Sequence, residues 1–79
     1  MKKVFLGGIF IKQDNDNAIL HSLYFTRVDL DLSLDFLQKE YPSTPFVYSS
    51  NYAPYNLNPD NSAMIENLKV QALLNHKED

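Results

Sequence analysis

The first residues that could carry out chemistry are a histidine and the serine that follows it, His21 and Ser22. Histidine can give or take a proton near neutral pH, so it is a natural candidate for a general base. Residues 18–27 alternate in character, which is typical of a strand and places His21 on the same face as Ile19 and Leu23. Ser22 then points to the opposite face. We therefore expect His21 to be a packed core histidine and not a general base.

Three carboxylates follow, at Asp29, Asp31 and Asp35. If this stretch is extended, carboxylates two residues apart share a face and could bind a hard cation; if it is helical, they disperse around the helix start and favour its dipole. Residues 28–34 alternate as in a strand, but a larger set fits helical spacing: Leu30, Leu34, Leu37 and Tyr41. We predict a short helix over about residues 32–41, ended by Pro42, and no metal site.

A pair of glycines, Gly7 and Gly8, interrupts the apolar run of residues 4–11. The pair could form a β-bulge, a point where another backbone or a ligand comes close, or the turn of a very short hairpin. We favour the bulge, because a hairpin with three-residue arms is only marginally stable. Together with His21, these glycines also mark the place where a small-molecule-binding domain or a minor enzyme would have its pocket.

The most distinctive stretch, residues 48–58, is rich in Tyr, Ser and Asn. Antibody combining loops favour the same residues, because Tyr offers a large contact area with few rotatable bonds and Ser and Asn offer adaptable hydrogen bonds. The alternative is that the tyrosines pack over the sheet edge while the asparagines cap turns. We predict a partner-binding loop that uses Tyr48, Asn51, Tyr52, Tyr55 and Asn56.

A final helix is expected to begin near residues 60–62 and to run to about Asn75. One apolar stripe comprises Met64, Ile65, Leu68 and Ala72. Other apolar side chains point elsewhere, so the helix needs a second covering surface, either the first helix or a second subunit. We predict a homodimer centred on Val70, Leu73 and Leu74.

The elements that must position these residues follow the order β-β-α-β-α. Strands are expected over residues 4–11, 18–27 and 46–48, with a loop over residues 51–61. The predicted fold class is α+β: a small two-layer sandwich in which a mainly antiparallel three-stranded sheet carries two helices on one face. Residues 1–79 form a single domain, because a chain of this length has room for one core.

Composition excludes several classes of function. The seven basic residues are scattered, so no dense footprint for nucleic acid exists, and no apolar run is long enough to span a bilayer. The chain has no cysteine and none of the common nucleotide or hydrolase signatures. We expect no cofactor, a cytoplasmic location and no enzymatic activity. The leading hypothesis is a small accessory protein, an adaptor or inhibitor, that binds a larger protein partner.

Overall fold

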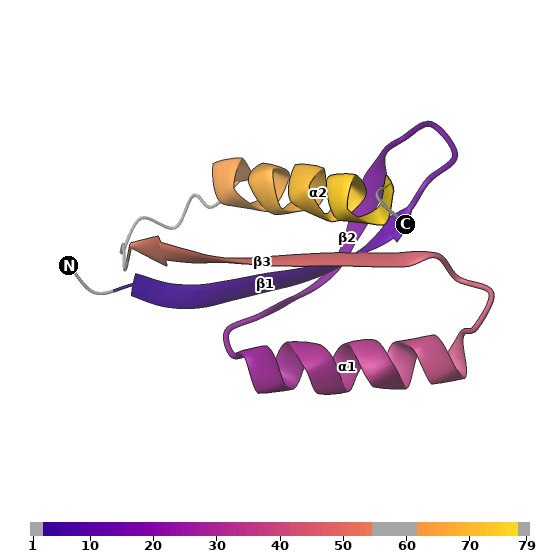
Figure 1. Ribbon diagram of the computed structural model, residues 1–79, viewed down its shortest axis with the longest axis horizontal. Helices are drawn as coiled ribbons and strands as arrows, with labels where there is room; N and C mark the ends of the chain where they lie inside the picture. Colours follow the sequence, from indigo (N-terminus) through magenta and orange to yellow (C-terminus); the bar gives the residue numbers. More distant parts are fainter. Residues whose placement is uncertain (1–2, 55–61, 78–79) are drawn as a thin grey trace.

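The computed structural model describes residues 3–54 and 62–77 and has five elements in the order β-β-α-β-α. They are β1 (Lys3–Lys12), β2 (Ala18–Tyr24), α1 (Arg27–Glu40), β3 (Phe46–Pro54) and α2 (Ser62–Lys77). The three strands form one antiparallel sheet in the order β2-β1-β3, so β1 is the central strand and both neighbours are edge strands (Figure 1). The predicted α+β class, element order and antiparallel sheet are confirmed.

The two helices lie on opposite faces of the sheet, which corrects the expectation that both cover one face (Figure 1). Successive side chains of β1 alternate between two cores: Phe5 and Ile9 pack with the buried leucines of α1, and Leu6 and Phe10 pack with Leu68 of α2. An uninterrupted apolar run is what a strand covered on both sides requires. The fold is therefore three layers, α1, sheet and α2, and not two.

The glycine pair lies inside the continuous strand β1, so it forms neither a hairpin turn nor the predicted bulge. A Cβ atom on Gly7 would stand 3.0 Å from Leu30 Cδ2, and one on Gly8 would stand 3.0 Å from Phe10 Cε1. The glycines are thus close-approach positions, as one alternative held, but the approaching groups are core side chains. Gly7 allows α1 to sit against the sheet.

The bulge occurs in β2, at His21. Ile9 pairs with Ser22 and Phe10 pairs with Leu20, which leaves His21 as the extra residue of the ladder. Because a bulge shifts the alternation by one residue, Leu23 packs in the same core as Ala18. The single alternating pattern expected for residues 18–27 is therefore wrong from this point on.

Helix α1 starts five residues earlier than predicted, at Arg27, so residues 28–34 are helical. Thr26 is the N-cap: its backbone is extended and its hydroxyl oxygen accepts a hydrogen bond of 3.1 Å from the backbone N–H of Asp29. The expected stripe is confirmed for Leu30, Leu34 and Leu37, which are buried against the sheet, but not for Tyr41, which is exposed and caps the end of the helix.

Strand β3 is nine residues long, so residues 51–54 are strand where a loop was predicted. The chain re-enters the described region at Ser62, where α2 begins. The predicted α2 stripe is confirmed: Leu68 and Ala72 are buried, with Met64 and Ile65 packed beside them. No helix in the described ranges is long and apolar enough to cross a membrane.

Candidate protein-binding edge

The predicted recognition residues lie on an edge strand. Tyr48 and Tyr52 share the face of β3 that looks toward α1, and their exposed fractions are 45% and 60%. Asn51 is also exposed, and strand alternation places it on the other face. Tyr55 and Asn56 lie outside the described residues. The structure thus brings Tyr48 and Tyr52 together on a rigid element, although a loop was expected to carry them.

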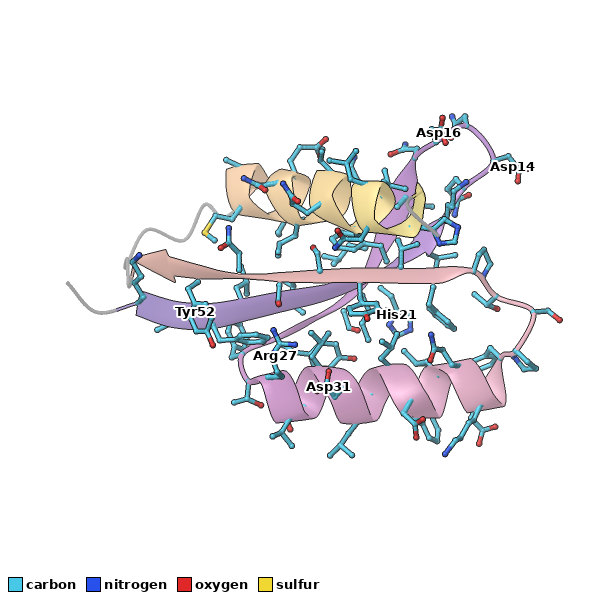
Figure 2. All side chains as sticks on the ribbon, in the orientation of Figure 1. Asp14, Asp16, His21, Arg27, Asp31 and Tyr52 are labelled. Atoms are coloured by element: carbon cyan, nitrogen blue, oxygen red, sulfur yellow. The ribbon has the colours of Figure 1, made fainter. Side chains whose placement is uncertain are left out.

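A cluster of aromatic and polar side chains fixes Arg27 beside these tyrosines. The guanidinium carbon of Arg27 stands 5.4 Å from the centroid of the Phe5 ring, and its Nη2 donates a 3.1 Å hydrogen bond to Ser50 Oγ. Phe5 in turn meets Tyr52 edge to face, with ring centroids 5.7 Å apart. Figure 2 shows Arg27 and Tyr52 near one another between the sheet and the start of α1. Arg27 was not among the predicted partner-binding residues, because its neighbours Ser50 and Phe5 are distant from it in sequence.

The main chain of β3 offers a second set of contacts along its outer edge. Lys12 N donates to Pro45 O at 2.9 Å, and hydrogen-bonded pairs alternate along an antiparallel ladder. The register then assigns Val47, Ser49 and Asn51 to the bonds with β1. The N–H and C=O groups of Tyr48 and Ser50 consequently point away from the sheet.

The outward N–H groups nearer the two ends of β3 are already hydrogen-bonded. The N–H of Tyr52 points outward too, but it donates to the side-chain Oδ1 of Asn51 at 2.8 Å. The N–H of Phe46 is taken by Thr44 O at 3.0 Å. Within the described residues no bond occupies the outward N–H groups of Tyr48 and Ser50. The open part of the edge is therefore short and central, around residues 48–50.

A hollow of about 510 Å³ lies at the same edge, and α1, β3 and α2 all contribute to its lining. The lining residues are Gln38, Phe46, Val47, Tyr48, Ala72, Asn75 and His76. Because Gln38 belongs to the helix on one face and Ala72 to the helix on the other, the hollow wraps around the strand edge. Its floor is the first half of β3.

Ser49 anchors this edge to α2. Its side chain is buried, and Ser49 Oγ donates a 2.6 Å hydrogen bond to the backbone oxygen of Leu68. A bond from a strand to a helix carbonyl holds the two elements in one position. The tyrosines of β3 are therefore presented from a strand that is held against α2.

His21 is exposed, which contradicts the expectation of a core histidine. The bulge turns it toward the α1 side, where its ring meets Phe46 edge to face at 6.1 Å. His21 Nδ1 and Ser22 Oγ lie 3.0 Å apart, and Ser22 Oγ donates to the hydroxyl of Tyr24 at 2.6 Å. The expectation that Ser22 points to the face opposite His21 is therefore also wrong.

A second hollow, of about 250 Å³, lies between β2 and α1. It is lined by His21, Tyr24, Leu32, Ser33, Phe36 and Leu37. Gly7 and Gly8 are buried under core side chains and do not line it. The prediction that Gly7, Gly8 and His21 share one pocket is therefore wrong.

The proposed dimer residues separate into two environments. Val70 and Leu74 are exposed, with exposed fractions of 45% and 49%, whereas Leu73 packs against the core between the sheet and α2. A stronger unpartnered stripe lies on α1, where Val28, Leu32 and Phe36 are each more than half exposed and recur every fourth residue. The alternating apolar residues of 28–34 already indicated this stripe. In the helix, Leu30 and Leu34 are buried, whereas Val28 and Leu32 are exposed.

Comparison with protein-family models, with curated proteins and with solved structures found no match.

Proposed function

We propose that the protein is a small accessory binding protein, an adaptor or inhibitor, which recognises a larger protein partner through β3. The observation that supports this most directly is the exposure of Tyr48 and Tyr52 on one face of an edge strand, with Arg27 held beside them by Ser50 and Phe5. We place this binding in the cytoplasm, as the cysteine-free composition favours.

The chemistry of these side chains suits protein recognition. Tyr and Arg are enriched among the residues that dominate binding energy at interfaces, because each combines a large contact surface with hydrogen-bonding groups. A side chain that is already held loses less conformational freedom on binding. Arg27 is held by its bond to Ser50 Oγ, and Tyr52 by its contact with Phe5. Both can therefore contribute more of their contact energy to a partner.

The test is the double variant Tyr48→Ser/Tyr52→Ser, used as bait for affinity purification with mass spectrometry. We expect loss of the specific partner with an unchanged circular dichroism spectrum, because both side chains are exposed. Tyr41→Ser is the matched control: Tyr41 is equally exposed but lies at the C-terminal end of α1. A partner captured equally by the wild type and the double variant would contradict the proposal.

A second candidate function rests on the His21 cluster. With Ser22 Oγ donating to Tyr24, the tautomer that joins His21 to Ser22 carries its proton on Nδ1, and Nε2 is then free to accept a proton. This arrangement, at the mouth of a hollow lined by Leu32 and Phe36, suits a small-molecule site or a minor enzyme.

Turnover of 4-nitrophenyl acetate tests this second candidate. The candidate requires a rate above that of free imidazole at the same concentration, and His21→Gln should abolish the excess. His76→Gln is the control for a surface histidine outside the cluster. A wild-type rate no higher than that of imidazole would remove esterase-like chemistry from consideration.

We also propose a weak homodimer through the exposed part of α2, Val70 and Leu74. The supporting observation is that both side chains are close to half exposed one turn apart. Leu73 no longer belongs to this surface, because it packs against the core.

A further inference from the structure

We infer that the open edge of β3 binds an extended segment of the protein partner, which adds to the sheet as a fourth strand. This inference rests on the proposed function and specifies its mode: main-chain hydrogen bonds from Tyr48 and Ser50, with the two tyrosine side chains alongside. Strand addition of this kind takes its affinity from the backbone and its specificity from the neighbouring side chains.

Strand β3 has the free hydrogen-bonding groups that strand addition requires, and they point outward from the sheet. The bond from Lys12 N to Pro45 O fixes which residues of β3 face β1, so Tyr48 and Ser50 present both their N–H and C=O groups outward. The next outward N–H, at Tyr52, is already capped by Asn51. An added strand would therefore exchange bonds with residues 48–50 and would end near Tyr52.

The opposite edge of the sheet is less suited to the same role. Strand β2 contains the bulge at His21, and a bulge breaks the regular spacing of outward N–H and C=O groups. The pairing of β1 with β3 runs from Lys3–Pro54 to Ile11–Phe46 without a shift of register. Only β3 therefore offers a regular template within the described residues.

The walls of the edge hollow favour a single extended segment over a second copy of the chain. Helix α2 packs mainly on β3, and a helix with its side chains is about 10 Å wide, against roughly 4.8 Å between neighbouring strands. A helix that lies mainly over an edge strand thus projects beyond that strand. Gln38 of α1 lines the same hollow from the other face. A second sheet edge, flanked by its own helices, could not approach closely enough to pair, whereas one bare strand could.

The same walls specify the character of the segment. On the α2 side the hollow is lined by Val47, Ala72, Asn75 and His76; Val47 and Ala72 are almost fully buried, so the accessible contacts there are the polar ones of Asn75 and His76. On the α1 side Phe46 and Tyr48 offer aromatic contacts and Gln38 a polar one. Because strand side chains alternate between faces, we expect a partner segment that alternates polar residues with apolar or aromatic ones.

The test uses octapeptides selected from a random phage-displayed library on the immobilised full chain. Selection should enrich alternating sequences, and Ser50→Pro should weaken the binding of the selected peptides by about tenfold or more, because proline removes the outward N–H. That N–H makes no bond within the sheet, so the fold should persist, as proline is tolerated on the solvent side of edge strands. Ser50→Ala is the matched control: it also loses the bond to Arg27 but keeps the N–H, so it should bind the selected peptides about tenfold or more tightly than Ser50→Pro does.

A second measurement needs no variant. In the wild-type protein, amide hydrogen exchange of Tyr48 and Ser50 should slow when a selected peptide is added, whereas Val47 and Ser49 should already exchange slowly in the free protein. Unchanged exchange at Tyr48 and Ser50, or equal peptide binding by Ser50→Pro, would overturn the inference. A dimer that Ser50→Pro abolishes would assign the edge to a second copy and would also overturn it.

The outcome can be separated from that of the proposed function. If Tyr48→Ser/Tyr52→Ser abolishes capture of the partner while Ser50→Pro leaves it intact, β3 binds by its side chains alone and strand addition is wrong. If Ser50→Pro abolishes peptide binding while the tyrosine double variant still captures its partner, the edge is a strand-addition site and the tyrosine surface is not the partner site.

Discussion

Gly7 is the residue at which the packing of α1 on the sheet depends most directly on a missing side chain. Leu30, whose Cδ2 occupies the space beside Gly7, is fully buried, with Leu34 and Leu37 in the same core. Leu30 therefore has little freedom to move away. The close contact that makes glycine necessary at this position is one between a helix side chain and the middle of the central strand.

Gly7→Ala should destabilise the protein by about 1 to 3 kcal/mol, because the new methyl group overpacks a core that cannot relax. The gain from restricting the unfolded chain, about 0.4 to 1 kcal/mol, opposes this loss but does not cancel it. Urea denaturation followed by circular dichroism measures the difference. Leu30→Val should recover part of the loss in the double variant, and additive effects of the two substitutions would argue against a direct clash.

His21 and Arg27 illustrate the limits of sequence reasoning at the scale of single residues. His21 is the bulged residue of β2, so it lies at the surface and not in the expected core. The alternating pattern of the sequence does not indicate where a strand pair contains an extra residue. Arg27 belongs to the candidate site for two reasons. Strand β3 places Ser50 within hydrogen-bonding distance of its guanidinium, and the Phe5 ring lies beneath that group. Both positions depend on pairing between strands, which a local pattern does not encode.

The start of helix α1 is set by a specific side chain. Thr26 accepts from the N–H of Asp29, and Asp29 adds a negative charge to the first turn. The alternating apolar residues that follow are compatible with a strand. The cap and the buried leucines at helical spacing together decide in favour of a helix.

Thr26→Ala should lower the free energy of unfolding by roughly 1 kcal/mol, because the N–H of Asp29 loses its partner. Thr26→Ser should stay close to wild type, since serine supplies the same hydroxyl. Thermal unfolding of the three proteins at one pH and one salt concentration provides the comparison. Equal unfolding midpoints for wild type and Thr26→Ala would show that water satisfies the N–H of Asp29 as well as Thr26 does.

The order and type of all five elements could be predicted from the sequence, but the extent of α1 and β3 could not. Apolar periodicity located Leu30, Leu34 and Leu37 correctly, because burial against a sheet imposes it directly. The second half of β3 was mistaken for a loop, since Ser, Asn and Tyr are typical of loops. In the structure these residues are strand because β1 offers a complete ladder from Lys3 to Ile11.

At the scale of the whole molecule, the placement of the helices on opposite faces leaves each helix with one outward side. Neither helix can cover the other, because the sheet separates them (Figure 1). The alternative that α1 would cover the second apolar face of α2 is therefore wrong. The outward apolar side chains of α1 and α2 are accordingly available for contacts with other molecules.

The proposed homodimer predicts that Leu74→Asp converts a weak dimer to monomer. Burial of a half-exposed Val or Leu contributes roughly 1 kcal/mol, against several kcal/mol lost in association, so only a weak dimer is expected. Light scattering across a dilution series detects it, and Gln71→Asp is the control for an added charge on an exposed position of the same helix. Helix content should not change in either variant.

Two results would contradict this assembly. A wild-type chain that stays monomeric at high concentration would exclude the dimer. A dimer that survives Leu74→Asp but is lost on Leu32→Asp would move the interface from α2 to the exposed stripe of α1.

The central position of β1 has a consequence for synthesis on the ribosome. β1 leaves the ribosome before either neighbour, and β3 begins 34 positions after β1 ends (46 − 12). At about 5 to 20 residues per second, this separation corresponds to roughly 2 to 7 s of translation, whereas a hairpin closes in microseconds. Any β1–β2 hairpin that forms on the nascent chain, marginally stable by itself, therefore has its future β3 edge open for seconds. During that interval a chaperone, or a neighbouring nascent chain, can compete for the place that β3 will take.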